Sequence, residues 1–306
     1  MMTFDADEVR AGCDALDGDG GAVVVPCEVV AVVGPDAGRY LQGQCSQELV
    51  AMAGPSAWTF VLAPTGRVDA WVRVHRVDDE HYLLETTTGS GDALVARLRR
   101  FLLRTDATVH EPDAWTVVHR RWRPTLVRVG DVDGLVAPAI APGDAGVDVL
   151  VAPGGSADDG DLPSVPFASM ERHRIAHAMP RLGAEIDETT IPAELGQWVI
   201  DASVSFTKGC YTGQELVARI DSRGGQVPRP VRLLALDGDV AIGSVVRGAD
   251  GEERGSISSA APSLGGDRGA LALAPLGRAV VIGERVVVAT ATGEVGGTVV
   301  EPGSVR

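Results

Sequence analysis

Lysine and asparagine are almost absent from these 306 residues. Lys208 is the only lysine among 27 basic residues, and no asparagine occurs. Where arginine supplies nearly every positive charge, a single lysine indicates a need for a compact ammonium group, with chance retention at the surface as the alternative. The 42 acidic residues give a net charge of −15, which argues against a protein that coats nucleic acid or anionic membranes.

Paired cysteines and long apolar runs are also missing. Cys13, Cys27, Cys45 and Cys210 form no CxxC pair, and no cysteine–histidine group has the spacing of a zinc or iron–sulfur site. The acidic N-terminus lacks the features of a signal peptide, and no apolar run approaches the roughly 20 residues that span a bilayer. We therefore expect a cytoplasmic protein in a reducing compartment, with no membrane segment.

The pattern of apolar residues changes near residue 226. Before that point helices and strands alternate: strands at 29–33, 67–77, 81–87, 115–119, 125–129 and 147–151, and helices after Gly34-Pro35, at 92–104 and at 166–178. After it, short valine- and leucine-rich strands are separated by Asp-Gly and Gly-Gly turns. We predict an α+β region over 1–225 and a small β-barrel over 226–306.

The segment 203–225 is the most unusual part of the chain. Val204 and Phe206 predict a strand at its start, and the later residues predict a helix that begins with a Thr212–Glu215 capping box. Cys210 precedes that helix and is two residues from Lys208, an arrangement that favours a thiolate. The alternative for Cys210 is a small buried apolar residue.

The sequence Lys-Gly-Cys-Tyr-Thr-Gly-Gln-Glu at 208–215 resembles the signature of the YgfZ family. These folate-binding proteins are related to the aminomethyltransferase, or T-protein, of the glycine cleavage system. Further matching segments lie at 33–44, at 64–67 and between Met179 and Pro192. The resemblance extends over roughly residues 23–230.

This resemblance implies an aminomethyltransferase-like fold of antiparallel sheets with helices around a central cavity, plus the C-terminal barrel. It implies that the cavity holds tetrahydrofolate or a one-carbon derivative. It also implies a role in assembling or maintaining iron–sulfur clusters, including those of tRNA-modifying enzymes. The expected partners are folate, iron–sulfur proteins and their assembly machinery, and the expected state is a monomer.

The resemblance also indicates which residues form the site. Cys210, as a redox or otherwise functional thiol, and Lys208 are the candidates for chemistry. The expected folate-binding residues are Tyr40, Gln42, Gln44, Arg67, Arg174, Lys208, Tyr211, Gln214 and Glu215. Among them, Arg67, Arg174 and Lys208 are the cations suited to the glutamate tail of folate.

Two departures from the aminomethyltransferases argue against aminomethyl transfer. Their paired aspartates are replaced by Ala70 and Trp71, with Asp69 offset by one position, and a shift of one residue moves a side chain to the other face of a strand. Their pterin-binding glutamate corresponds to Ala176. We therefore favour a folate-binding assembly factor. A folate-dependent one-carbon transferase or demethylase and a folate-free scaffold are the alternatives.

A histidine pair and two arginine clusters remain. His173 and His177 share one face of a helix, but the sequence reveals no third ligand, so we expect no metal site. The arginines at 120–123, which flank Trp122, are interpreted as a solvated edge rather than an RNA contact, and so are those of 97–104.

Overall fold

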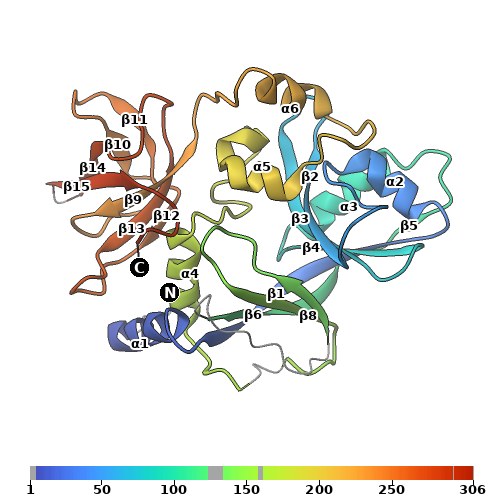
Figure 1. Ribbon diagram of the computed structural model, residues 1–306, viewed down its shortest axis with the longest axis horizontal. Helices are drawn as coiled ribbons and strands as arrows, with labels where there is room; N and C mark the ends of the chain where they lie inside the picture. The colour runs from blue at the N-terminus through green and yellow to red at the C-terminus, as the bar shows by residue number, and fades with distance from the viewer. Residues whose placement is uncertain (1–4, 123–133, 158–160, 292, 306) are drawn as a thin grey trace.

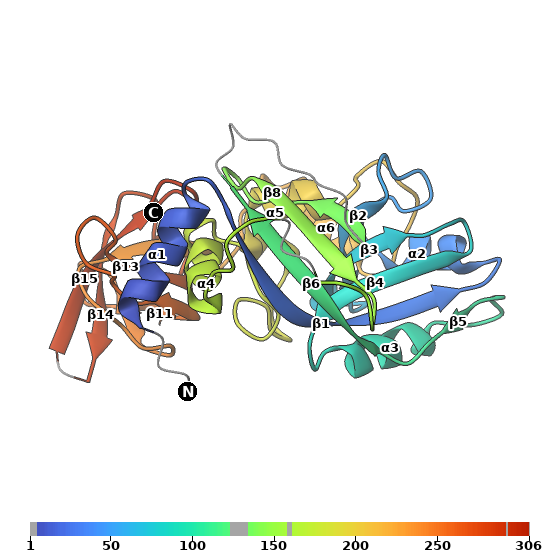
Figure 2. The same cartoon turned by 90° about the horizontal axis from the view of Figure 1, so that it is seen from below.

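The computed structural model describes residues 5–122, 134–157, 161–291 and 293–305. It confirms the predicted fold class: antiparallel sheets and short helices form the larger part, and a second antiparallel sheet forms the C-terminal part (Figures 1 and 2). The larger part contains α1 (Ala6–Leu16), β1 (Gly21–Val33), α2 (Ala37–Gln44), β2 (Ser56–Leu62), β3 (Val68–Arg76), β4 (His81–Thr87), α3 (Gly91–Arg100), β5 (Thr108–Val109), β6 (Asp113–Arg121), β7 (Leu135–Pro138), β8 (Gly146–Val151), α4 (Phe167–Ala176), a 3₁₀ turn (Pro192–Leu195), α5 (Gln197–Ser203) and α6 (Gln214–Asp221). No helix among the described residues is both long enough and apolar enough to cross a membrane.

The long strand β1 organises the first sheet, whose order is β2-β3-β4-β1-β6-β8-β7. Residues 21–29 of β1 pair with β6, and residues 27–33 pair with β4 on its other edge. Each half of β1 therefore belongs to a different half of the sheet (Figure 2). Helices α2 and α3 cover one face, where Leu41, Leu94 and Leu98 pack among the valines of β1 and β3. Burial of these apolar side chains is the main stabilising contribution on this face.

The second sheet has the order β11-β10-β14-β15-β9-β13-β12. Its strands are β9 (Val231–Leu236), β10 (Val245–Arg247), β11 (Glu253–Ser256), β12 (Ser259–Ala261), β13 (Ala270–Pro275), β14 (Arg285–Thr290) and β15 (Gly293–Val300). A bridge between Gly255 and Leu276 brings β11 back to the end of β13, so the sheet curls into a barrel. Helix α4 lies against this barrel (Figure 1), with Ile175 and Ala176 among the leucines of β9 and β13. Ala176 thus contributes to packing between the two parts.

Two local predictions for 203–225 are wrong. Residues 204–206 form no strand, because α5 continues to Ser203 and the amide of Val204 still donates to the carbonyl of Ile200. The Thr212–Glu215 capping box is also not formed. Helix α6 begins after Gly213, which has a φ of 82°, and the side-chain oxygen of Gln214 accepts from the amide of Tyr211 instead. The strand predicted at 125–129 lies outside the described residues.

Candidate functional site

A cavity of about 430 Å³ lies between the first sheet, helix α4 and the segment 179–182. Strands β2, β3, β4, β6 and β8 contribute side chains to its wall, and α4 contributes the opposite side. This volume falls within the range of small-molecule sites. The cavity therefore lies at the centre of the larger part, where the resemblance places the folate.

Two tryptophans form an apolar part of this wall. The rings of Trp58 and Trp71 are stacked with centroids 4.2 Å apart, and the guanidinium of Arg73 lies 4.7 Å from the Trp58 ring centroid. The indole N–H of Trp71 donates to Ser203 Oγ at 2.9 Å, which fixes its ring. The wall is thus flat, aromatic and bordered by a positive charge.

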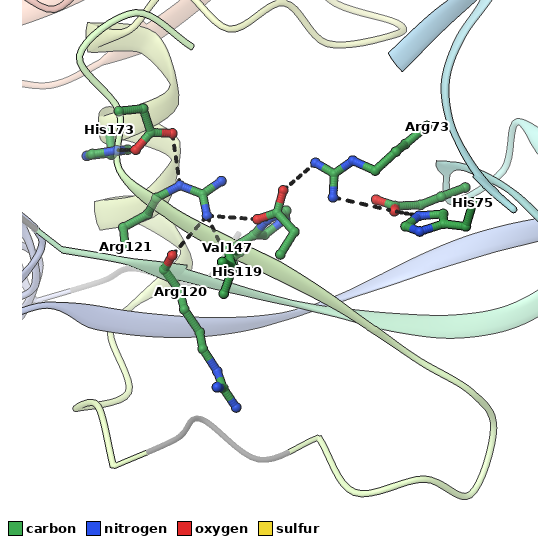
Figure 3. Close-up of polar contacts among 10 residues, drawn as sticks. Arg73, His75, His119, Arg120, Arg121, Val147 and His173 are labelled. Atoms are coloured by element: carbon green, nitrogen blue, oxygen red, sulfur yellow. Dashed lines mark hydrogen bonds and ion pairs between the residues drawn. The ribbon is translucent and has the colours of Figure 1, made fainter. Parts of the chain in front are cut away.

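Arg73 lies at the centre of a buried chain of charges (Figure 3). Arg73 is directly opposite Glu85 in the β3–β4 pairing, with Nη1 3.8 Å from the carboxylate, and its Nη2 donates to Asp148. His75 Nε2 lies 3.0 Å from the same oxygen of Glu85. Although burial alone would raise the pKa of Glu85, the charge of Arg73 and the hydrogen bond with His75 lower it.

Asp148 extends the chain of charges to β6. His119 is directly opposite Asp148 in the β6–β8 pairing, and His119 Nδ1 and Arg121 Nη1 each lie 2.7 Å from Asp148 Oδ1. Burial opposes ionisation, but the guanidinium groups of Arg121 and Arg73 hold the pKa of Asp148 well below its usual value. Asp148 therefore stays ionised between two buried arginines.

Arg121 connects this chain of charges to α4. Its Nε donates to Asp144 Oδ2 at 2.9 Å, and His173 Nε2 lies 2.9 Å from Asp144 Oδ1 (Figure 3). Against the effect of burial, Arg121 and His173 lower the pKa of Asp144 to about 2. Burial and the neighbouring His173 lower the pKa of His177. Asp144 is the third group beside His173 and His177 that the sequence did not reveal.

The interpretation of residues 120–122 as a solvated edge is wrong. Arg120, Arg121 and Trp122 are all buried, at 3, 7 and 6% exposure. Arg97 also turns inward, since it donates to Asp69 and to the carbonyl of Leu62. Arg123 lies outside the described residues.

Several donors beside the cavity have no hydrogen-bond partner in the described part of the chain. They are Nε and Nη1 of Arg73, Nε1 of Trp58 and the hydroxyl of Thr86, all buried atoms. Buried N–H groups are ordinarily paired, so unpaired ones beside a cavity mark where a ligand could supply a partner after a small side-chain rotation. The nitrogens belong to two side chains that are in contact, since the Arg73 guanidinium lies 4.7 Å from the Trp58 ring centroid.

Arg174 is the one predicted folate-binding residue that lines this cavity. Its donors are engaged with carboxylates: it binds Glu171 through two bonds of 3.0 and 2.7 Å, and it binds Glu185 at 3.1 Å. It also donates to Ser259 Oγ at 2.7 Å, on β12. Arg174 therefore connects α4 to the barrel.

Lys208 lies elsewhere, beside the loop that follows α2. Its ammonium nitrogen donates to three backbone carbonyls, those of Gln42 at 2.7 Å, Cys45 at 2.7 Å and Gln47 at 2.8 Å. Three donors on one small atom suit an ammonium and not a planar guanidinium. Burial lowers the pKa of Lys208 to about 8.

The rest of the 208–215 segment packs on the same part of the chain. The amide of Thr212 donates to the carbonyl of Gly43. A Cβ on Gly66 would lie 2.4 Å from Leu216 Cβ, and one on Gly213 would lie 2.6 Å from the carbonyl of Ala63. The three segments that carry the resemblance, 41–44, 64–67 and 208–215, are therefore packed together.

The other predicted folate-binding residues belong to this packed region or to the surface. The Tyr40 hydroxyl donates to the carbonyl of Leu98, and burial raises its pKa. Gln42 binds Glu48 and the amide of Leu49, and Gln44 accepts from Arg97. Tyr211 is half-buried below Lys208, with its pKa raised to about 12 by burial, while Arg67 and Glu215 are exposed.

Cys210 is exposed, whereas Cys13, Cys27 and Cys45 are buried. Burial raises the pKa of the Cys27 and Cys45 thiols to about 12 and also raises that of Cys13. Cys210 is thus the accessible thiol. The Lys208 ammonium, which the sequence placed beside it, is bound to the three carbonyls.

Comparison with known proteins gives sequence relatives and a structural one. No family model matches the chain. It is 29% identical over 205 residues to a mitochondrial iron–sulfur cluster assembly factor IBA57 homolog of Pyricularia oryzae, covering 64% of this chain and 52% of that protein. Over 52 residues it is 48% identical to the tRNA-modifying protein YgfZ of Aliivibrio fischeri, covering 17% of this chain and 16% of that protein. The resemblance to the YgfZ family is confirmed.

A further sequence relative and a solved structure also match. An uncharacterized protein of Haemophilus influenzae is 27% identical over 203 residues, covering 64% of this chain and 67% of that protein. The aminomethyltransferase T of the glycine cleavage system from Bartonella henselae has the same fold, with a TM-score of 0.77 at 15% identity. That match covers 96% of this chain and 89% of the aminomethyltransferase. This chain spans about half the length of its fungal relative.

Proposed function

We propose that this chain binds a reduced folate, tetrahydrofolate or a one-carbon derivative, in its central cavity. We propose further that it acts in the assembly or maintenance of iron–sulfur clusters, including those of tRNA-modifying enzymes, in the cytoplasm. The names of the IBA57 and YgfZ relatives support the second part. The aminomethyltransferase fold supports the first.

The tryptophan wall is the observation that carries the folate proposal. A pterin is a flat ring rimmed with hydrogen-bonding atoms, and it needs an aromatic surface and a few donors and acceptors. The stacked Trp58 and Trp71 offer the surface, and Arg73, whose Nε has no hydrogen-bond partner, offers a donor. Glu85, Asp148 and Arg181 also line the cavity and supply further charges.

Aminomethyl transfer is not part of this proposal. Asp69 lies at an irregularity in the β2–β3 pairing and binds Arg97 Nε at 2.9 Å, on the side of α3. Trp71 occupies the cavity wall instead. A carboxylate engaged on the other face of β3 does not reach a ligand in the cavity, so the chain is proposed to bind folate without transferring an aminomethyl group.

Cys210 and Lys208 have different proposed roles. Cys210 is exposed and suits a functional or redox thiol that meets a partner protein. Lys208 holds the loop after α2 against the segment that carries Cys210. We propose that Lys208 positions this segment and does not itself contact the folate.

Binding of 5-formyltetrahydrofolate, a stable reduced folate, tests the proposal. At a ligand concentration near 100 times the Kd, we expect about 2.7 kcal/mol of stabilisation against thermal unfolding. Trp58→Leu removes one ring of the stack and is expected to weaken binding at least tenfold. Trp115→Leu, a half-buried tryptophan of β6 that does not line the cavity, is the matched control. No stabilisation at millimolar ligand would refute the folate proposal.

The role in cluster maintenance has a separate test. In a deletion strain with a defect in an iron–sulfur enzyme, the wild-type gene is expected to restore that enzyme's activity, whereas Cys210→Ala is not. If the wild-type gene restores the enzyme activity but the protein binds no folate, the folate-free scaffold becomes the favoured alternative. Formation of methylenetetrahydrofolate from an aminomethylated carrier at ordinary enzyme rates would favour the transferase instead.

A further inference from the structure

Three potential metal ligands meet where the β7–β8 turn faces the end of α4. Asp144 lies in that turn, and His173 and His177 lie one helical turn apart at the end of α4. One nitrogen of each imidazole and one oxygen of the carboxylate lie within 4.8 Å of one another. The two rings have centroids 4.3 Å apart. Figure 3 shows His173 directed towards the carboxylate that Arg121 binds.

The hydrogen bonds around these groups orient them as metal ligands are usually oriented. His177 Nδ1 lies 2.9 Å from the carbonyl of His173, so its N–H donates there and Nε2 keeps a lone pair. Arg121 donates to Asp144 Oδ2, so Oδ1, which faces His173 Nε2 at 2.9 Å, is the oxygen that a cation would take. His173 is neutral when its proton moves to Nδ1, and Nε2 is then free to coordinate.

An ordinary histidine–aspartate pair does not account for this cluster. Such a pair needs one imidazole, and His173 already supplies it at 2.9 Å from Asp144. His177 brings a second imidazole beside the first one. All three residues line the 430 Å³ cavity, so a bound ion would keep coordination positions open to that space.

We propose that Asp144, His173 and His177 bind one divalent transition-metal ion, Fe²⁺ or Zn²⁺, at the wall of the cavity. Two imidazole nitrogens and one carboxylate oxygen with open positions are the donor set of catalytic zinc and of non-haem iron sites. Metal–ligand bonds of about 2.0–2.2 Å require donors roughly 3–3.5 Å apart. Asp144 Oδ1 and His173 Nε2 already lie 2.9 Å apart, so a side-chain rotation is needed chiefly at His177.

This proposal does not depend on folate binding or on the role in iron–sulfur clusters. The sequence alone reveals the two histidines on one helix face, whereas the carboxylate belongs to a turn 29 residues earlier. The charge of Arg121 beside Asp144 is balanced by Asp148, which accepts from the same guanidinium. The negative charge of Asp144 thus remains available to a cation.

Metal titration of the full chain tests the proposal. The Cys210→Ser variant serves as the parent, because it removes the exposed thiol as a competing ligand. We expect it to bind one equivalent of Zn²⁺ in competition with a chromophoric chelator. We also expect Co²⁺ to give visible absorption bands of a four- or five-coordinate ion. His177→Gln in this parent should lower the affinity at least about 100-fold, whereas His110→Gln, an exposed histidine, should not change it.

Two outcomes would overturn the proposal. One is the absence of stoichiometric binding at micromolar Zn²⁺ in the parent, and the other is unchanged binding in a folded His177→Gln variant. If His177→Gln does not fold, NMR spectra of the histidine side chains in the Co²⁺-loaded parent test the site instead. Paramagnetic shifts at His173 and His177 support the site, and shifts confined to other histidines refute it.

Discussion

Replacement of Lys208 by methionine tests the role of the one lysine. Methionine fills a similar volume without the ammonium, so the carbonyls of Gln42, Cys45 and Gln47 lose their shared donor. Hydrogen bonds to a charged group contribute about 1.5–3 kcal/mol each. Because the three bonds share one atom and water reaches a half-buried site, we expect a loss of about 2–4 kcal/mol in the free energy of unfolding.

Arginine at position 208 gives the sharper comparison. It keeps the charge, but its planar group cannot direct three N–H donors from one atom towards three converging carbonyls. We therefore expect Lys208→Arg to recover less than half of the stability lost in Lys208→Met. Arg219→Met, which removes an exposed charge from α6, is the matched control and should change the stability by less than about 0.5 kcal/mol.

Urea unfolding followed by tryptophan fluorescence measures this effect selectively. All five tryptophans precede residue 226, so the signal reports the part of the chain that contains Lys208 and not the barrel. A Lys208→Met variant within about 0.5 kcal/mol of wild type would refute the reasoning. So would a Lys208→Arg variant as stable as wild type, since charge alone would then be sufficient.

Three further predictions use the same structure. Gly66→Ala, at a φ of 84° and against Leu216, should lower the free energy of unfolding by about 1–3 kcal/mol in urea titrations. Gly209→Ala, which faces open space, should change it little. Asp148→Asn should cost about 3–5 kcal/mol at pH 7 in the same titrations, because two buried guanidinium groups lose their carboxylate. Since the folded pKa of Asp148 is depressed, its stabilisation is present above about pH 4 and is lost as the pH falls further, so a difference that vanishes by pH 5 would contradict this account. In native protein, iodoacetamide should label Cys210 before the three buried cysteines, as peptide mass spectrometry will reveal; equal labelling of Cys45 would contradict the burial argument.

Local patterns were sufficient for the elements whose apolar residues repeat regularly. The amphipathic pattern of 92–104 predicts α3, and its Leu94, Val95 and Leu98 are buried as expected. The alternation in 67–77 and 81–87 predicts the hairpin of β3 and β4. Each depends on residues close together in the chain, which fix the period of the helix or strand. The segment 208–215, with the matching segments at 33–44, 64–67 and 179–192, likewise carried the family resemblance.

Side-chain direction at polar positions was decided by tertiary structure. The arginines of 120–121 resemble a surface edge in the sequence, but the pairing of β6 with β8 turns Arg121 towards Asp148 and buries it. The rarity of lysine draws attention to Lys208, but not to its surroundings. Its carbonyl partners lie more than 160 residues earlier, and no local spacing reveals them.

The sequence by itself determined the fold class, through its change of pattern near residue 226 and its resemblance to a known family. Tertiary structure alone decided which charged groups meet around the cavity. Asp144 joins His173 and His177 because a β-turn and a helix end pack against each other, and Arg73 meets Asp148 because two strands 75 residues apart share one sheet. Helix and strand periods follow from neighbouring residues, whereas a buried charge becomes stable only when a distant partner compensates its lost hydration.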